Sequence, residues 1–256
     1  NLGSPKNFNL VELGAGNGEM MKVFIESFRK FPAFNNSCKI YIYEKSPLLI
    51  KIQKKKLKDK RIIWLSNLKK IKKFPTVFIA NEFFDSIAIK QFIKLDNSWF
   101  ERFVNFKNKT EAFFFDKKIN MNEFEKKIKY KITQNQNFIE YSEIGINYLK
   151  YISKIIRKNQ GGILIIDYGY LDMKMRNTLQ AISKHKYSNI LKNIGTSDIT
   201  HNINFNLFKK TIAQLGELEN IITTQRKFLI KMGIKERAEI ISRNLTFIKK
   251  ADIFYR

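Results

Sequence analysis

The chain is 256 residues long, 44% of them apolar and 14% aromatic, which is enough to bury a substantial core and excludes a chain that is disordered throughout. No apolar run approaches the roughly 20 residues that span a bilayer, so we expect no membrane span. The formal net charge of +25 does not by itself indicate a nucleic-acid-binding protein, because Lys outnumbers Arg by 39 to 9 and Arg is the better phosphate ligand.

Five buried strands are predicted from short apolar runs, and helical patterns separate them. The strands are expected at residues 8–13, 38–43, 61–65, 76–80 and 162–167. Between them, helices are expected over 18–31, where Pro32 ends the helix, from Ser46-Pro47 onward, and through about 140–158. This alternation predicts an α/β fold with a mostly parallel, doubly wound sheet.

Two stretches interrupt the alternation and are interpreted as insertions, at about 90–133 and 169–204. The first contains two β-like runs around the turn Asp96-Asn97 and then a Lys-rich polar segment, whereas the second lacks strong periodicity. A further strand, antiparallel in the sheet, is expected at 223–233, followed by a helix. Because we find no internal repeat and no Pro/Gly/Ser linker, we interpret residues 1–256 as a single domain.

The stretch ELGAGNG, which ends the first strand, indicates a nucleotide site. A dinucleotide-binding loop requires a third glycine at position 19, which is Glu here. Glu12 and Glu19 would repel a pyrophosphate and suit a cationic ligand without phosphates. S-adenosylmethionine (SAM), with its sulfonium and ammonium groups, is such a ligand. We therefore predict that Glu12, Gly14, Gly16 and Gly18 bind SAM.

Polar side chains after the second and third strands complete the predicted cofactor site. Glu44 follows the second strand, where a carboxylate accepts hydrogen bonds from both ribose hydroxyls. That contact is shared by NAD and SAM, so it indicates adenosine without choosing between them. Ser66 and Asn67, after the third strand, are expected to reach the adenine edge.

Acidic and amide side chains follow the fourth strand, at the edge where ligands bind in open α/β sheets. Asn81, which is also a candidate cofactor ligand, and Glu82 are expected to face the reactive methyl group. In methyl transfer the enzyme mainly aligns the acceptor and stabilises its charge. Glu82 and Asp85 suit a guanidinium acceptor, which carboxylates bind bidentately, although Asp85 equally fits a helix cap.

Four further candidates come at or after the end of the fifth strand. Asp167 and Tyr168 follow the fifth strand, and Asp167 is interpreted as a ligand for a cation or as a turn cap. His201 comes three residues after Asp198, and this pair is expected to bind substrate or accept a proton, or to be structural. We expect no metal site, since two His and one Cys provide too few soft ligands.

Seven stretches stand out in order along nearly the whole chain: VELGAGNG (11–18), YEKSPLL (43–49), ANEFFDSIAIKQF (80–92), WFER (99–102), GGILIIDYGY (161–170), GTSDITHNINF (195–205) and TTQRKFLIKMGI (223–234). Together they resemble the MidA family of SAM-dependent protein arginine methyltransferases, which are linked to assembly of respiratory complex I. The chain departs from the family at Ala15 and Asn17, where Pro and Arg are usual, and at Ile203 and Asn204, where Val and Asp are usual. None of these changes removes a predicted ligand.

The resemblance implies a Rossmann-like class I SAM-dependent methyltransferase fold and methylation of an arginine in a complex I core subunit. It also implies a family segment before the first strand that helps to close the SAM pocket. Because this chain lacks an initiator Met, we expect that its true N-terminus is lost. The single Cys38 indicates a reducing compartment, either the cytoplasm of a bacterium or the mitochondrial matrix of a eukaryote.

Three other functions are weighed against this hypothesis. A nucleic-acid methyltransferase would account for the positive charge, but no Pro-Pro-aromatic motif follows Asn81. A non-catalytic assembly module would retain the fold without SAM binding. Hydride transfer with NAD would account for the adenosine site, but Glu19 argues against it. We therefore expect a protein substrate and no nucleic acid, and a homodimer is left open.

Overall fold

The computed structural model describes residues 2–108, 111–192, 195–216, 218–246, 249 and 253. Residues 109–110 and 193–194, which fall within the two expected insertions, lie outside the described residues. Two compact units form, Asn1–Leu218 and Glu219–Arg256. No helix in the described part of the chain is long and apolar enough to cross a membrane.

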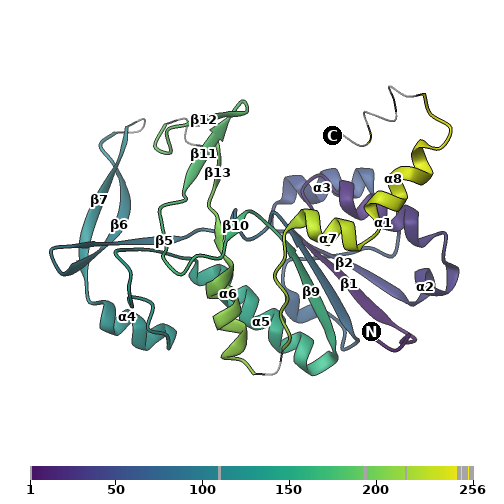
Figure 1. Ribbon diagram of the computed structural model, residues 1–256, viewed down its shortest axis with the longest axis horizontal. Coiled ribbons are helices and arrows are strands. Elements are labelled where there is room, and N and C mark those ends of the chain that lie inside the picture. The colour runs from purple at the N-terminus through teal and green to yellow at the C-terminus, as the bar shows by residue number, and fades with distance from the viewer. Residues whose placement is uncertain are drawn as a thin grey trace. The chain divides into compact units, whose positions relative to one another are not determined.

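A five-stranded parallel sheet is the centre of the first unit (Figure 1). Its strand order is β3-β2-β1-β4-β9. The strands are β1 (Phe8–Leu13), β2 (Cys38–Tyr43), β3 (Ile63–Leu65), β4 (Thr76–Asn81) and β9 (Gly161–Ile166). All five predicted strands are confirmed. The three inner strands β1, β2 and β4 are largely buried on both faces, which is why their sequences are mostly apolar.

Alternate residues of these strands pack on opposite faces of the sheet. Leu10 and its neighbours pack with α1 (Glu19–Phe28), and α3 (Pro47–Lys56) lies on the same side. Val11 and its neighbours pack with α5 (Glu143–Asn159), on the other side. The serine expected to open the second helix does cap α3, since the Ser46 hydroxyl accepts a hydrogen bond from the backbone N–H of Leu49.

The prediction that Pro32 ends the first helix is wrong. Helix α1 stops at Phe28, and Pro32 instead begins a short helix, α2 (Pro32–Ser37). The fixed φ of proline suits the first turn of a helix, where its missing N–H costs nothing. The same residue therefore marks a beginning rather than an end.

A four-stranded antiparallel sheet is built from the first expected insertion and the strand that follows it, in the order β7-β6-β5-β8. Its strands are β5 (Lys90–Leu95), β6 (Ser98–Phe106), β7 (Ala112–Ile119) and β8 (Phe138–Tyr141). The predicted hairpin is confirmed, and both residues of its turn, Asp96 and Asn97, have positive φ as two-residue hairpins require. The segment expected only to be polar and Lys-rich contains β7 and α4 (Met121–Ile128).

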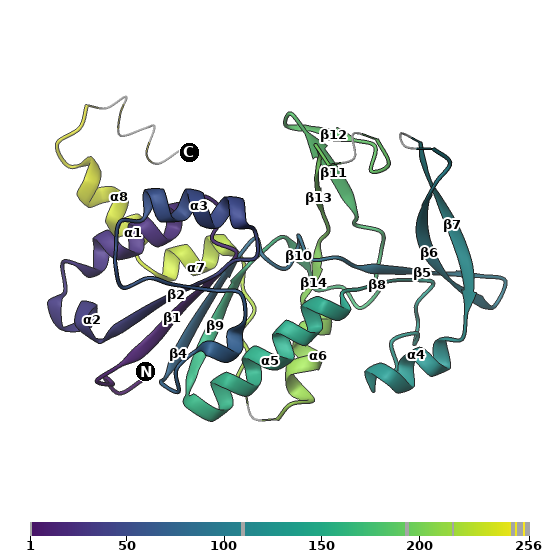
Figure 2. The same ribbon diagram turned by 180° about the vertical axis from the view of Figure 1, so that it is seen from behind.

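Short strands form in the second expected insertion, where no periodicity was visible. They are β10 (Gly169–Tyr170), β11 (Gln180–Ser183), β12 (Lys186–Ser188), β13 (Asp198–Thr200) and β14 (Ile203–Asn204). Helix α6 (Phe205–Ala213) follows and packs beside α5 (Figure 2).

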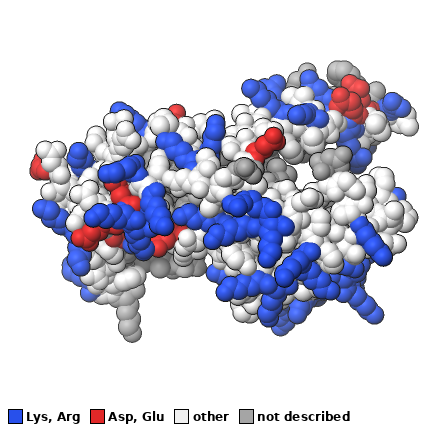
Figure 3. All heavy atoms as spheres, turned by 90° about the horizontal axis from the view of Figure 1, so that it is seen from below, with Lys and Arg blue, Asp and Glu red and all other residues white. Residues whose placement is uncertain are grey.

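Lys and Arg side chains are spread along the face of the molecule seen in Figure 3, with few acidic residues among them.

The second unit contains α7 (Gln225–Lys231) and α8 (Ile234–Ser242). The antiparallel strand expected at 223–233 is therefore wrong, and the central sheet is parallel throughout. The Thr224 hydroxyl caps α7 by accepting a hydrogen bond from the backbone N–H of Lys227, and Gly233, at φ 85°, separates the two helices. A short apolar run such as Phe228–Ile230 fits a helix as well as a strand, so these local signals decide between the two.

Candidate active site

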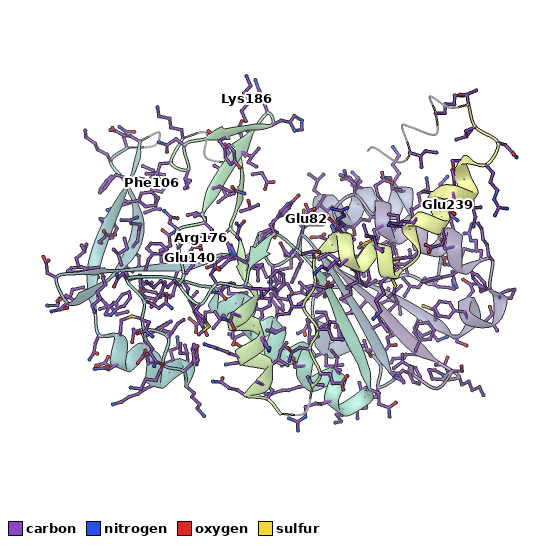
Figure 4. All side chains as sticks on the ribbon, in the orientation of Figure 1. Glu82, Phe106, Glu140, Arg176, Lys186 and Glu239 are labelled. Atoms are coloured by element: carbon purple, nitrogen blue, oxygen red, sulfur yellow. The ribbon has the colours of Figure 1, made fainter. Side chains whose placement is uncertain are left out.

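The carboxyl ends of the parallel strands meet at one edge of the sheet. Leu13 lies opposite both Tyr43 and Ala80, and Asn81 lies opposite Ile166. The predicted ligands that come directly after these strands therefore share this edge: Gly14, Glu44, Ser66, Glu82 and Asp167. Figure 4 shows Glu82 at this end of the sheet.

The three glycines after β1 all have positive φ, but for different reasons. A Cβ on Gly14 would lie 2.9 Å from the Phe83 ring, and one on Gly18 would lie 3.1 Å from Leu57. A Cβ on Gly16 would meet nothing within 4 Å. Gly14 and Gly18 are thus closely packed by neighbouring side chains, whereas Gly16 borders open space that a ligand can enter.

Glu12 is the strongest sign of a ligand at this edge. Its side chain is buried in β1, with 2% of the residue exposed, and its Oε2 has no hydrogen-bond partner among the described residues. Burial raises the pKa of this carboxyl from 4.5 to about 7. A buried carboxylate oxygen without a donor is costly unless a bound group supplies one.

The pKa of Glu12 predicts a pH-dependent stability. The folded protein holds this proton more tightly than the unfolded chain, so stability is lost as the pH rises from about 4.5 through about 7. The full cost, roughly 3 kcal/mol, is present above that range. Glu12→Gln should remove it, so the variant should gain stability over the wild type between about pH 5 and pH 8. Urea unfolding followed by circular dichroism at the two pH values measures the gain.

Glu26→Gln is the matched control, because Glu26 is an exposed residue of α1. Its stability difference from the wild type should be the same at both pH values. A constant difference for Glu12→Gln as well would contradict the interpretation.

Glu44 is buried at the end of β2 and is held by neighbouring donors. Its Oε1 accepts hydrogen bonds from the backbone N–H groups of Lys45 and Ser46, both at 2.9 Å, and its Oε2 accepts one from Gln53 Nε2 at 3.2 Å. A carboxylate has about four acceptor sites and three are used here, so capacity remains for about one ribose hydroxyl. The neighbouring donors therefore fix the position of the carboxylate and leave part of its hydrogen-bonding capacity for a ligand.

Gln53 is a site residue that the sequence did not indicate. Its side chain is fully buried, and its Nε2 also donates to the carbonyl oxygen of Gly16 at 2.8 Å. Its Oε1 accepts a hydrogen bond from Trp64 Nε1 at 3.0 Å. One glutamine therefore links the glycine loop, Glu44 and β3. It stands on a Lys-rich helix, where no motif distinguishes it.

Three other residues of the expected cofactor side are exposed. Glu19 forms an ion pair with Lys56, which lowers the pKa of its carboxyl. Its charge is compensated, so the electrostatic argument against a phosphate rests on Glu12 alone. Asn67 caps a short helical turn by accepting a hydrogen bond from the backbone N–H of Lys69 at 2.9 Å, and Ser66 precedes it.

The acceptor side begins where β4 ends. Asn81 is half-buried, and Glu82 is exposed with a left-handed φ of 46°. Such a conformation is strained for a residue other than glycine, and strained residues gather at functional sites. The backbone N–H of Glu82 donates to the carbonyl of Ile166 at 2.9 Å, which fixes the residue against β9.

Asp85 is buried in the turn that follows, with 5% of the residue exposed and Oδ1 unpartnered among the described residues. Burial and the charge of Glu82 raise the pKa of its carboxyl, and His201 partly offsets them. The helix-cap alternative for Asp85 is wrong, because no helix follows it. Its buried carboxyl is instead free to meet a ligand.

Asp167 holds the same turn from β9. Its Oδ2 accepts hydrogen bonds from the backbone N–H groups of Phe84 and Asp85, at 3.0 and 3.3 Å, and its Oδ1 accepts one from Tyr168 at 2.9 Å. Burial, and then the charge of Asp85, raise the pKa of Asp167 from 3.8 to about 7. Asp167 thus joins the ends of β4 and β9.

His201 is buried beside this turn. Its backbone N–H donates to the carbonyl oxygen of Asp85 at 3.0 Å, and its Nε2 lies 3.1 Å from the carbonyl oxygen of Ile87. Asp198 and Tyr168 are exposed, and these two side chains form no ion pair or side-chain hydrogen bond with His201 in the described part of the chain. The structure therefore brings His201 to Asp85 rather than to Asp198.

A cavity lies next to His201 but away from the glycine loop. Its lining includes Phe84, Glu140, Ser142, His201 and Leu207, and none of the residues from Gly14 to Gly18. Because Asn81, Glu82 and Asp85 do not line it either, this cavity coincides neither with the predicted cofactor position nor with the predicted acceptor carboxylates.

Comparisons with known proteins identify the family of the chain. The model of a family described as "Putative S-adenosyl-L-methionine-dependent methyltransferase" matches residues 1–222. Two similar curated proteins are the mitochondrial protein arginine methyltransferase NDUFAF7 of Xenopus laevis and its Caenorhabditis elegans homologue, at 25% and 27% identity. Each alignment covers 93% of this chain and 60% of the relative, so the chain spans about three fifths of their length.

Two solved structures from Burkholderia thailandensis have the same fold. An uncharacterized protein matches with a TM-score of 0.79 at 19% identity, over 98% of this chain and 70% of the other. A related protein, crystallised with S-adenosyl-homocysteine, matches with a TM-score of 0.76 at 18% identity, over 98% and 67%. The predicted α/β methyltransferase fold is thereby confirmed.

Proposed function

The chain belongs to this family of S-adenosyl-L-methionine-dependent methyltransferases, the MidA family that its motifs resemble, and from that premise we propose that it methylates an arginine of a protein. The relatives named protein arginine methyltransferases support this substrate class. We propose a core subunit of respiratory complex I as the substrate, modified during assembly in a mitochondrial matrix or a bacterial cytoplasm. One observation supports the proposal most strongly. The predicted cofactor residues Glu12, Gly16 and Glu44 lie at the same edge of the parallel sheet as the predicted acceptor residues Glu82 and Asp85.

The residues at this edge suit SAM. Gly16 borders open space, Glu12 has a buried oxygen without a donor, and Glu44 keeps acceptor capacity. Glu12 would accept from the cationic part of the cofactor and Glu44 from its ribose, with Ser66 and Asn67 near the adenine. When bound, SAM supplies an electrophilic methyl group.

The acceptor residues suit a guanidinium. Glu82 would bind it through its exposed carboxylate, and Asn81 would orient it beside the cofactor. Asp85 would accept the proton that the nitrogen loses, and burial together with the charge of Glu82 raises the pKa of this carboxyl, which makes it a better base. Asp167 and His201 position this turn, and the exposed Tyr168 and Asp198 would meet the substrate chain further out.

Gly16→Asn should weaken SAM binding at least tenfold without unfolding the protein. Asn tolerates the left-handed φ of 51°, and its Cβ would meet no protein atom within 4 Å, so its side chain would occupy the open space itself. Isothermal titration with SAM measures the affinity, and circular dichroism the melting temperature.

Gly216→Asn is the matched control, because Gly216 also has positive φ and open space around its Cβ position. It should leave SAM affinity unchanged. Equal affinity for both variants would mean that the open space at Gly16 is not the cofactor site.

The proposed activity itself is tested by transfer of labelled methyl from SAM to a complex I core subunit, with mass spectrometry to locate the modified arginine. Modified arginine is the expected result. Labelling of RNA but not protein would instead identify a nucleic-acid methyltransferase, and absence of SAM binding would identify a non-catalytic assembly module.

A further inference from the structure

The far part of the β6–β7 hairpin carries apolar side chains on both of its faces. We call residues 102–106 and 112–116 the aromatic ribbon. Six of its large apolar residues are 37–53% exposed: Phe103, Val104, Phe106, Phe113, Phe114 and Phe115. Figure 4 labels Phe106, near the tip of the hairpin and away from Glu82. Contiguous exposed apolar surface of this kind marks interaction sites.

The strand register places these residues on two opposite faces. Phe103 lies opposite Phe115, and their rings stack with centroids 5.4 Å apart. Val104 lies opposite Phe114 on the other face, where the Arg102 guanidinium lies 5.3 Å from the Phe114 ring centre. No layer of the described chain therefore covers either face fully.

The outer edge of β7, and the edge of β6 beyond Arg102, also lack a strand partner in the described residues. β7 is the outermost strand of its sheet, and β5 pairs with β6 only from Ser98 to Arg102. Unpaired backbone N–H and C=O groups along such an edge are a template for another strand. A lipid bilayer cannot satisfy these groups, whereas a polypeptide can. This favours a protein segment over a membrane surface.

Charge at the base of β7 indicates the chemistry of that segment. Arg102 is paired with Asp116, and Lys107 with Glu111. Lys117 and Lys118 are exposed and form no ion pair with a described residue. The uncompensated charge along this edge is therefore positive, in a chain whose net charge is +25.

We propose that the aromatic ribbon binds an extended, acidic and apolar segment of a partner protein, which adds to the outer edge of β7 as a further strand. Main-chain hydrogen bonds provide the affinity in this mode of binding. Apolar side chains of the segment cover one face of the ribbon, and its carboxylates reach Lys117 and Lys118. The site is separate from the methyl-transfer edge and does not depend on it.

A fluorescein-labelled decapeptide of alternating Val and Glu is the probe, and fluorescence anisotropy measures its binding to the whole chain. Lys117→Glu with Lys118→Glu should raise its dissociation constant at least tenfold. Lys154→Glu with Lys158→Glu, exposed lysines of α5, is the matched control and should leave it unchanged. With protein labelled by ¹⁵N-Phe, the peptide should shift the amide signals of Phe113, Phe114 and Phe115.

Two further peptides test the strand geometry and the charge. A version N-methylated at alternate residues, which lacks half of its donors, and a version of alternating Val and Lys should both bind at least tenfold more weakly. Equal binding of either peptide would overturn the proposal. Binding to phosphatidylglycerol vesicles would also overturn the proposal if the folded protein did not bind the Val-Glu peptide and Phe115→Ser abolished the vesicle binding. Dimerisation in sedimentation would overturn it under the same two conditions. None of these measurements uses SAM, so their failure leaves the proposed methyl transfer untouched.

Discussion

Glu82→Gln is expected to lower the rate of methyl transfer at least 100-fold and to leave SAM affinity unchanged. Glu82 is the exposed carboxylate at the end of β4, held by its backbone N–H against β9 in a left-handed conformation. Gln keeps the size and the hydrogen-bonding carbonyl but loses the charge that would stabilise the cationic acceptor. Losing one such preorganised group costs on the order of 3 kcal/mol in the transition state. Single-turnover transfer of labelled methyl, beside isothermal titration with SAM, measures both quantities.

Glu19→Gln is the matched control for this experiment. Glu19 is exposed and paired with Lys56 at the surface, so its loss should change neither the rate nor SAM affinity. If the two variants transferred methyl at equal rates, Glu82 would not be the acceptor ligand. If Glu82→Gln lost SAM binding, Glu82 would belong to the cofactor side.

Gly161→Ala is expected to destabilise the protein by more than about 4 kcal/mol, which is an exceptional effect for one methyl group. Gly161 begins β9 at φ +132°, and a Cβ there would lie 1.9 Å from the carbonyl oxygen of Thr76. That carbonyl belongs to β4, which pairs with β9 residue by residue up to Asn81. Neither strand can move aside without breaking this ladder. Thermal unfolding followed by circular dichroism measures the loss.

The neighbouring glycine provides the control. A Cβ on Gly162 would meet nothing within 4 Å, and this residue does not have positive φ. Gly162→Ala should therefore shift the melting temperature by only a few degrees. Similar melting temperatures for the two alanine variants would show that the close approach of β9 to β4 is not rigid.

The sequence predicted those strands whose burial on both faces produces a continuous apolar run. The central strands are covered on both faces, so each is a continuous apolar run. β7 is exposed on both faces, and its three consecutive Phe followed by Asp and Lys do not alternate between apolar and polar residues, so no strand pattern was visible there. The strands between 169 and 204 have only two to four residues each, too few for a period to be visible. Tertiary pairing determines such elements.

Part of the candidate site could be predicted because its residues directly follow the predicted strands. Gly14, Gly16 and Glu44 lie at fixed distances from predicted strand ends, so their shared edge followed from the alternation of strands and helices. Gln53 depends on a side-chain contact with a loop 37 positions away, and no local pattern records it. The bond from Phe84 to Asp167 spans 83 positions and is equally invisible in the sequence.

The hydrogen bond between His201 Nε2 and the carbonyl oxygen of Ile87 affects the order in which the parts of the candidate site form. It joins residues 114 positions apart, and it holds the turn that carries Asp85. On the ribosome, the glycine loop and all five central strands are synthesised before residue 201. Contacts between distant residues form last because their loops are costly to close. We therefore expect a growing chain to form the glycine loop and the central sheet first, and to fix the turn that carries Asp85 only after residue 201 has been synthesised.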